Sequence, residues 1–414
     1  MNIKKQILSY SSVNILNAAV PFFLLPILTK YLSPSDYGLL SLIQLLMLIS
    51  LPIVLMNTEG LLIIEYSKLS FENFQTLLST IIWIPVVGFL FLEVIFFIFK
   101  FYIIEYFHIP ASFVHFIPFF VLLQAVPTII PIIFQAKKEP FNFGKYKIAM
   151  TLLNVLLSLL FILYFIHGWE GRLYGIVGSF GVFTFVGFVV LLKLDLLKFR
   201  FDKKVLRSAL HFGLPLIPHT IAGVFLSMSD RIFLVNMLGE DSVGIYSVAF
   251  QIASVISIVM SSVNQAWAPF LYEKLNQEPS FYDKISIVKT TYKIMASMLL
   301  FALFFMFVSP YIYDIFIDKR YYVAKEITIF IALAFLFQGF YFMVTNYIFY
   351  SKKTKIISYI TVSSVLLVLV SNYFLIQSFG IFGSAYAFII VWLFQFTLTF
   401  YISNKIYPMP WSLK

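Results

Sequence analysis

Ionisable side chains interrupt long apolar stretches of this chain. Asp230 and Arg231 are adjacent within the apolar run 213–239, and Glu59 and Glu93 lie in two earlier runs. A carboxylate in such a place could carry a proton or hold a cation, and a guanidinium could hold an anion. Each charge costs about 2.5–3.5 kcal/mol at a bilayer centre. We therefore expect these groups to face a water-filled interior, the alternative being that they reach water at the ends of their spans.

The adjacent pair has a further constraint if its run is helical. Neighbouring residues point about 100° apart on a helix, so we expect Asp230 and Arg231 not to satisfy each other, and each to need another partner. The forked donors of Arg231 suit a diphosphate. The alternative is a structural pair with a carboxylate on another span. Asp230, Glu59 and Glu93 are the candidates for ion coupling.

Amides and lysines give the remaining candidates for substrate binding. Asn14 and Asn17 share one stripe of the first span, and Gln265 follows Asn264 in the eighth. These amides either line a cavity or join helices through hydrogen bonds. Two lysines enter the ninth span, where they either anchor the helix at lipid headgroups or receive a diphosphate: Lys289 and Lys293.

The composition predicts an all-α polytopic membrane protein. Of 414 residues, 61% are hydrophobic and 12% are charged, whereas soluble domains carry about 25% charged residues. With no cysteine, disulfides and thiolate metal sites are excluded. The histidines show no metal-ligand spacing, so no cofactor is expected. The net charge of +10 is explained by short basic loops, so no nucleic-acid partner is expected.

Twelve apolar runs are long enough to span a bilayer as helices, which requires about 20 residues. Prolines at 21, 26, 215 and 218 are expected to break the first and seventh spans. The predicted spans are 8–30, 38–64, 77–99, 113–136, 147–166, 174–192, 212–238, 243–268, 291–317, 327–350, 356–377 and 384–403.

The basic residues predict the orientation of the spans. With the N-terminus inside, 22 of the 29 Lys and Arg residues fall in cytoplasmic segments. This asymmetry predicts a multi-pass protein with both termini in the cytoplasm. The seven on the opposite side are Lys30, Lys100, Arg172, Arg231, Lys319, Arg320 and Lys325.

Short repeats predict two halves. LSPSDYGLLS (32–41) resembles LGEDSVGIYS (238–247), and GIVGS (175–179) resembles GIFGS (380–384), at offsets of 206 and 205. We expect an N-terminal six-helix bundle at 1–192, a C-terminal bundle at 212–414, and a basic linker at 193–211 lying on the anionic inner leaflet.

Two stretches resemble polysaccharide-export flippases of the Wzx, O-antigen type, which belong to the multidrug, oligosaccharidyl-lipid and polysaccharide exporter superfamily. These stretches are LPILTKYLSPSDYGLLSL, from Leu25, and GLPLIPHTIAGVFLSMSDRIFL, from Gly213. The resemblance implies two six-helix bundles around a central cavity that opens alternately to each side of a bacterial cytoplasmic membrane. It also implies a polyprenyl-diphosphate-linked sugar as substrate, in a membrane shared with glycosyltransferases and a polysaccharide polymerase.

Three functions are compatible with a polytopic chain of this kind. The first is this flippase, coupled to a proton or sodium gradient, since no nucleotide-binding Walker motif is present. The second is a drug or metabolite exporter of the same architecture. The third, a membrane-embedded polymerase, is disfavoured because the longest outer loop, 100–112, offers only Glu105 and His108 as acid/base groups.

The orientation can be tested with single cysteines, because the natural chain has none. Ser35→Cys and Ser242→Cys should react with an impermeant thiol reagent added to intact cells. Ser351→Cys should react only after the membrane is opened. Labelling of Ser351→Cys in intact cells would overturn the orientation.

Overall fold

The computed structural model describes residues 3–165, 168–198 and 200–412, and within these ranges all of the regular secondary structure is helical. Contacts divide the chain into two compact units, one ending at Val224 and the other beginning at Phe225. The boundary falls within a helix, Ile217–Met228.

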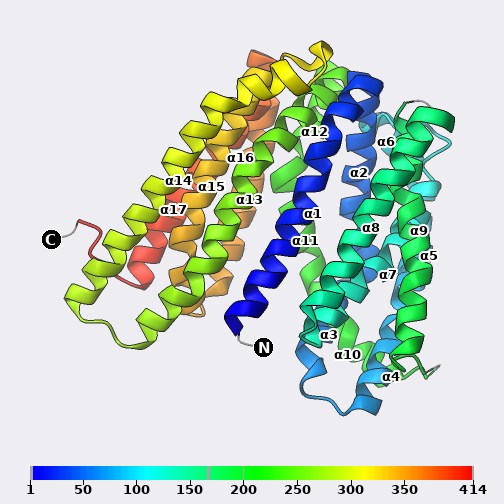
Figure 1. The fold of residues 1–414 in the computed structure, drawn as a ribbon, viewed down its shortest axis with the longest axis horizontal. Helices are drawn as coiled ribbons and strands as arrows, with labels where there is room; N and C mark the ends of the chain where they lie inside the picture. Colours follow the sequence, from blue (N-terminus) through cyan, green and yellow to red (C-terminus); the bar gives the residue numbers. More distant parts are fainter. Residues whose placement is uncertain (1–2, 166–167, 199, 413–414) are drawn as a thin grey trace. The chain divides into compact units, whose positions relative to one another are not determined.

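The first unit contains most of the interrupted helices (Figure 1). Its elements are α1 (Ile3–Tyr31), α2 (Pro34–Leu55), α3 (Glu59–Tyr66), α4 (Phe71–Ile81), α5 (Ile84–Ile98), α6 (Lys100–Phe107), α7 (Phe116–Ala136), α8 (Pro140–Leu160), the π-helix η1 (Phe161–Phe165), α9 (Trp169–Lys193), α10 (Lys203–Gly213), the 3₁₀ helix η2 (Leu214–Leu216) and most of α11 (Ile217–Met228).

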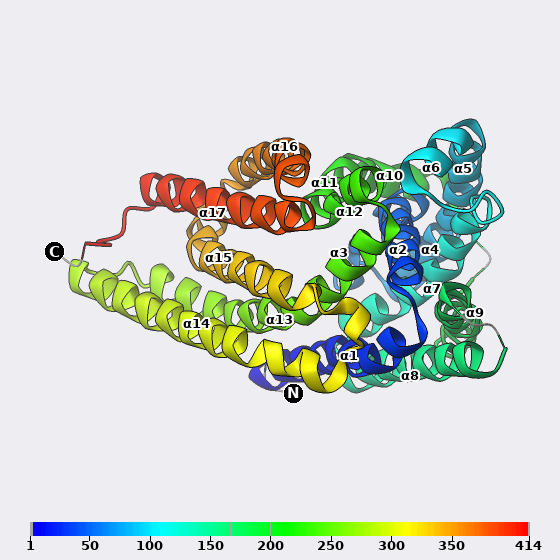
Figure 2. The same cartoon turned by 90° about the horizontal axis from the view of Figure 1, so that it is seen from above.

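The described part of the second unit contains five long helices, α13 to α17, and two short ones. They are α12 (Asp230–Leu238), α13 (Glu240–Asn276), α14 (Phe281–Phe316), the short η3 (Lys319–Tyr321), α15 (Ala324–Tyr350), α16 (Thr354–Phe379) and α17 (Ile381–Ile406). Figure 2 shows α15 between α13 and α17, against both of which it packs. Burial on both sides explains why α15 is apolar or small at most positions, with Ile331, Ala334 and Val344 fully enclosed.

The prediction of an all-helical membrane-spanning chain is confirmed. In the described part of the chain, eleven helices are long and apolar enough to span a membrane, and Val20–Tyr31 is a shorter apolar stretch at the position of the first predicted span. Large apolar side chains face outward on α5 and α14, where Phe97 is 71% and Phe307 69% exposed. Such surfaces are stable against lipid and not against water.

The prolines act differently in the two spans in which breaks were expected. Pro21 and Pro26 lie inside α1 without ending it. Pro215 lies in η2, where the chain tightens into a 3₁₀ turn between α10 and α11. The internal repeats occupy comparable positions, because Gly38 lies in the second turn of α2 and Gly244 in the second turn of α13, and both are buried.

Two interrupted helices meet inside the first unit. The α2 helix ends in left-handed residues, with φ of 49° at Met56 and 48° at Asn57, before α3 begins. The Asn57 amide nitrogen donates to the Thr220 hydroxyl on α11 at 3.0 Å. A Cβ at Gly213 would overlap the carbonyl oxygen of Met56. Only glycine therefore allows the α10–η2 junction to approach the end of α2 this closely.

This close approach predicts a large effect of one added methyl group. Gly213→Ala should lower the thermal stability of the detergent-solubilised protein, because overpacking against backbone costs about 1–3 kcal/mol. Gly60→Ala is the matched control, since its Cβ would meet Phe212 at an ordinary 3.7 Å. Equal melting temperatures for the two variants by fluorescence-detected size exclusion would contradict this packing.

Candidate functional site

Asp230 and Arg231 form a buried ion pair at the start of α12. The guanidinium Nη1 donates to the Asp230 carboxylate at 2.6 Å, and the same oxygen accepts the backbone N–H of Arg231 at 2.8 Å. Nη1 also donates to the carbonyl of Ser227 at 3.3 Å. The exposed fractions of the two residues are 4% and 2%. Each charge therefore has its counterion within the same turn of chain.

The expectation that these neighbours could not satisfy each other was wrong. It assumed one regular helix through residues 228–231. Instead, α11 ends at Met228 and α12 begins at Asp230, with a turn at Ser229 between them. At the first residue of a helix a carboxylate can turn back to the free backbone N–H groups. This conformation brings the Asp230 oxygen to both the backbone and the side chain of Arg231.

Aromatic rings of α13 cover the guanidinium. The Arg231 Cζ atom lies 4.5 Å from the ring centre of Phe250 and 5.5 Å from that of Tyr246. Attraction between a cation and an aromatic face is strongest where water is excluded, as it is here. Among the described residues, no acceptor is within hydrogen-bond distance of the buried Nε. Arg231 is thus largely neutralised but keeps one unused donor.

Glu93 has a partner that the sequence did not suggest. Its Oε1 lies 2.6 Å from Nδ1 of His115, which precedes α7, and the two side chains are 32% and 37% exposed. The second oxygen, Oε2, is buried, and no described group donates to it. A carboxylate and an imidazole this close can share or pass a proton. Glu93 is therefore paired and partly exposed.

Glu59 lies at the break of the second predicted span. It is the first residue of α3, directly after the left-handed residues that end α2. One of its carboxylate oxygens is buried without a donor among the described groups. The second predicted span is interrupted just before Glu59. The depth of Glu59 in the membrane therefore cannot be counted in residues from the end of a continuous helix.

The predicted amides join helices where the structure describes them. Asn17 on α1 accepts from the Thr151 hydroxyl of α8 at 2.9 Å. Asn264 on α13 accepts from the Asn346 amide of α15 at 2.9 Å. Gln265 is exposed. The Asn14 side chain lies outside the described residues.

The predicted lysines of α14 lie at its surface. Lys289 and Lys293 are exposed, while Val288, directly before the first lysine, and Thr291, between the two, are buried. This arrangement leaves both ammonium groups available to headgroups or to other anions. The structure brings neither lysine to the ion pair of α12.

Arg172 is a polar centre that the sequence did not reveal. It counted as one of the outer basic residues, yet it is only 9% exposed in α9. Its Nη1 donates to Asn154 at 2.6 Å and to the Ser158 hydroxyl, both on α8. No carboxylate of the described chain is within ion-pair distance of it. The only hint was a polar face on the fifth predicted span, with Asn154 and Ser158 four residues apart.

Asn372 is a second centre of this kind. It lies on α16, which packs against α12, and it is 1% exposed. Neither its amide oxygen nor its amide nitrogen has a partner among the described groups.

The described residues contain no group of three or more His, Cys, Asp or Glu side chains that could hold a metal ion.

Two family models match the chain. The model described as "Polysaccharide biosynthesis protein" matches residues 3–274. The MatE model matches residues 215–374. A protein of the Lsg locus of Haemophilus influenzae is 24% identical over 393 residues, covering 90% of each chain. An uncharacterised membrane protein of the same organism is 25% identical over 245 residues, covering 57% of this chain and 58% of its own.

Solved structures share the fold. The lipid II flippase MurJ, in an inward closed conformation, superposes with a TM-score of 0.70 at 17% identity, covering 96% of this chain and 87% of its own. An inward-facing multidrug resistance MATE transporter of the MOP superfamily gives 0.65 at 14% identity, covering 98% and 95%. The solved flippase and transporter show that the fold is shared, and the family match over residues 3–274 shows that the chain belongs to the polysaccharide biosynthesis protein family.

Proposed function

We propose that this protein moves a polyprenyl-diphosphate-linked oligosaccharide from the inner to the outer leaflet of a bacterial cytoplasmic membrane by alternating access. The observation that carries the proposal is the match of the polysaccharide biosynthesis family over residues 3–274. The relative from the Lsg locus and the fold shared with the lipid II flippase agree with it. An O-antigen or similar repeat unit is the expected cargo.

The negative charge of the diphosphate headgroup requires the protein to supply a compensating cation. A diphosphate headgroup carries negative charge through a region of low dielectric, where bringing an ion out of water costs several kcal/mol. A guanidinium offsets part of that cost, and its donors fit phosphate oxygens in pairs. Arg231 supplies such a cation in α12, between the candidate spans Lys203–Met228 and Glu240–Asn276. Gln265, Lys289, Lys293, Asn14 and Asn17 remain proposed contacts for the sugar or the headgroup.

Asp230, Glu59 and Glu93 are the proposed sites of coupling to a proton or sodium gradient. Asp230 is attractive because it is the counterion of the proposed headgroup ligand. Glu93 is attractive because His115 gives it a partner for proton exchange. Glu59 lies where one helix is interrupted, and interrupted helices often line the sites of transporters.

A drug or metabolite exporter is the second candidate function. The MatE match over residues 215–374 favours it, as does the shared fold with a multidrug transporter. The two functions differ in cargo, since an exporter takes a soluble or amphipathic small molecule and leaves the lipid-linked sugar in place.

The function can be tested in proteoliposomes that contain a fluorescent polyprenyl-diphosphate disaccharide. The flippase should make all of the probe accessible to an impermeant quencher, whereas empty liposomes expose only the outer-leaflet portion. A parallel assay follows an organic cation such as ethidium. Ethidium transport without movement of the lipid probe would establish the exporter and end the flippase proposal.

Substitution of Arg231 tests its role in that assay. Arg231→Lys should keep partial transport, because the charge stays while the fork is lost, and Arg231→Ala and Arg231→Gln should abolish it. The exposed Arg320→Ala is the control. If Arg231 has only a structural role, Arg231→Ala should instead lower protein abundance, because an unpaired buried Asp230 costs about 3–5 kcal/mol. Adding Asp230→Ala to that variant should then restore the abundance. Normal transport by well-folded Arg231→Ala would end the diphosphate role.

Coupling is tested by carboxylate substitutions under an imposed gradient. Glu93→Gln and Asp230→Asn should each slow transport driven by a proton or sodium gradient. Glu93→Gln should leave protein abundance unchanged, because partly exposed pairs contribute only about 0–1 kcal/mol to folding. Glu65→Gln, which removes an exposed pair with Lys68, is the control. Wild-type rates for both test variants would exclude both carboxylates as the coupling site.

A further inference from the structure

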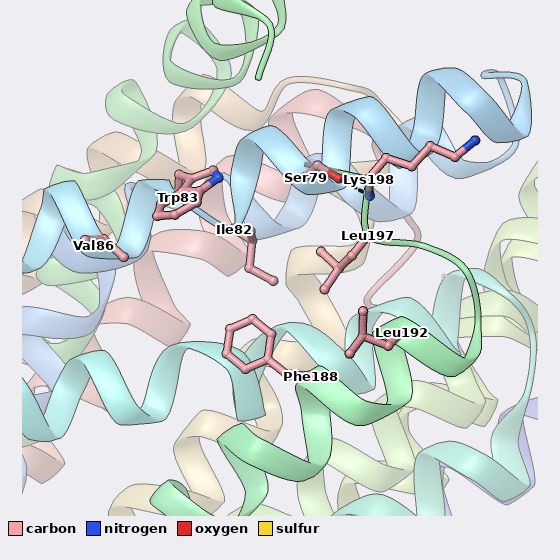
Figure 3. A pocket seen from close by; sticks show the side chains of 8 residues that line it. All are labelled: Ser79, Ile82, Trp83, Val86, Phe188, Leu192, Leu197 and Lys198. Atoms are coloured by element: carbon pink, nitrogen blue, oxygen red, sulfur yellow. Dashed lines mark hydrogen bonds between the residues drawn. The ribbon is translucent and has the colours of Figure 1, made fainter. Parts of the chain in front are cut away.

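An apolar cavity of about 220 Å³ opens in the first unit beside the junction of α4 and α5 (Figure 3). Its walls come from that junction, from the C-terminal end of α9, and from the segment that follows α9. The lining side chains are Ser79, Ile82, Trp83, Val86, Phe188, Leu192, Leu197 and Lys198. Apart from Ser79 and Lys198 they are apolar, so the cavity suits a hydrocarbon group.

The walls are fixed by hydrogen bonds behind the cavity. The backbone N–H of Lys198 donates to the Ser79 hydroxyl at 3.0 Å. One turn earlier, the Gln75 amide donates to the carbonyl of Asp195. These contacts hold the segment after α9 against α4, so the cavity is part of the folded unit and does not depend on a ligand to form.

The cavity opens toward lipid. Trp83 is 48% and Leu192 59% exposed, although both belong to candidate membrane spans. Exposed apolar side chains in a spanning segment contact acyl chains. A cavity between them is therefore open to the acyl chains of the bilayer.

Charge is concentrated at the polar end of the same cavity. In Figure 3 the ammonium of Lys198 extends along α4, away from the apolar lining. The segment 193–204 carries five basic and two acidic residues, and its basic members are Lys193, Lys198, Arg200, Lys203 and Lys204. A cluster of four to eight basic residues directly after a spanning helix is typical of anionic-lipid binding.

We infer that this cavity is a binding site for one anionic phospholipid. One acyl chain occupies the apolar cavity between α4, α5 and α9, and the phosphate lies against the ammonium of Lys198 at its rim. The single chain follows from the cavity's size, and the anionic headgroup from the basic segment. The cavity residues are different from the proposed coupling and substrate residues. Phospholipid binding to the cavity can be measured without a transport assay.

The experiment uses the full-length protein in nanodiscs with a photoactivatable phosphatidylglycerol that carries a diazirine in one acyl chain. After irradiation, peptide mass spectrometry should find label concentrated in residues 77–88 and 186–198. Val86→Trp fills the cavity and should remove most of that label. Val94→Trp is the matched control, because Val94 is also exposed on α5 but lies eight residues, or about 12 Å, farther along it.

The headgroup is tested by charge removal. Lys198→Gln should lower labelling by phosphatidylglycerol about fivefold, the factor expected for loss of ~1 kcal/mol per basic residue near an anionic surface. It should leave labelling by the matching phosphatidylcholine probe unchanged, and Lys204→Gln should have a smaller effect. Even labelling of all lipid-facing helices, or displacement of the label by polyprenyl phosphate and not by phosphatidylglycerol, would overturn the inference.

Discussion

The absence of water from the hydrocarbon region is the constraint on which this structure depends. A backbone group or charge that loses its partner there costs several kcal/mol, so a continuous helix is the default for every span. At two places where the chain departs from that default, a local partner is present. Asn57, in the break after α2, donates to Thr220, and the Gly213 junction packs on the carbonyl of Met56. Two breaks thus stabilise each other within one unit.

The same constraint explains the partners of the ionisable groups. Arg231 is neutralised by Asp230 and covered by two rings, Glu93 meets His115, and Arg172 is held by neutral oxygens of α8. The Arg231–Asp230 and Glu93–His115 contacts each join a group that can be positive to one that can be negative. Arg172 is different, because its charge is buried against dipoles alone. Burial of a cation in this way is costly and is retained where its hydrogen bonds join helices or where it serves a function.

The length of the apolar runs made the spans predictable, whereas local backbone geometry made the site hard to predict. Apolar length alone located the helices, since a bilayer sets a minimum length for each. The turn at Ser229 has no comparable signal, and a regular helix through Asp230 and Arg231 led to the wrong partners. His115 and Asn346 were missed because pairing between helices depends on which faces meet. Sequence spacing on one helix does not show this, whereas the three-dimensional fold does.

The Asp230–Arg231 pair connects the two parts of the proposed function. A diphosphate that binds Arg231 competes with Asp230 for the same donors, so the carboxylate loses its counterion when cargo arrives. An ionised carboxylate left alone at 4% exposure is unfavourable by several kcal/mol. It must therefore take up a proton or a metal cation, or the cargo must leave. In the proposed function, cargo binding at Arg231 and cation uptake at Asp230 are therefore linked through the counterion that they share.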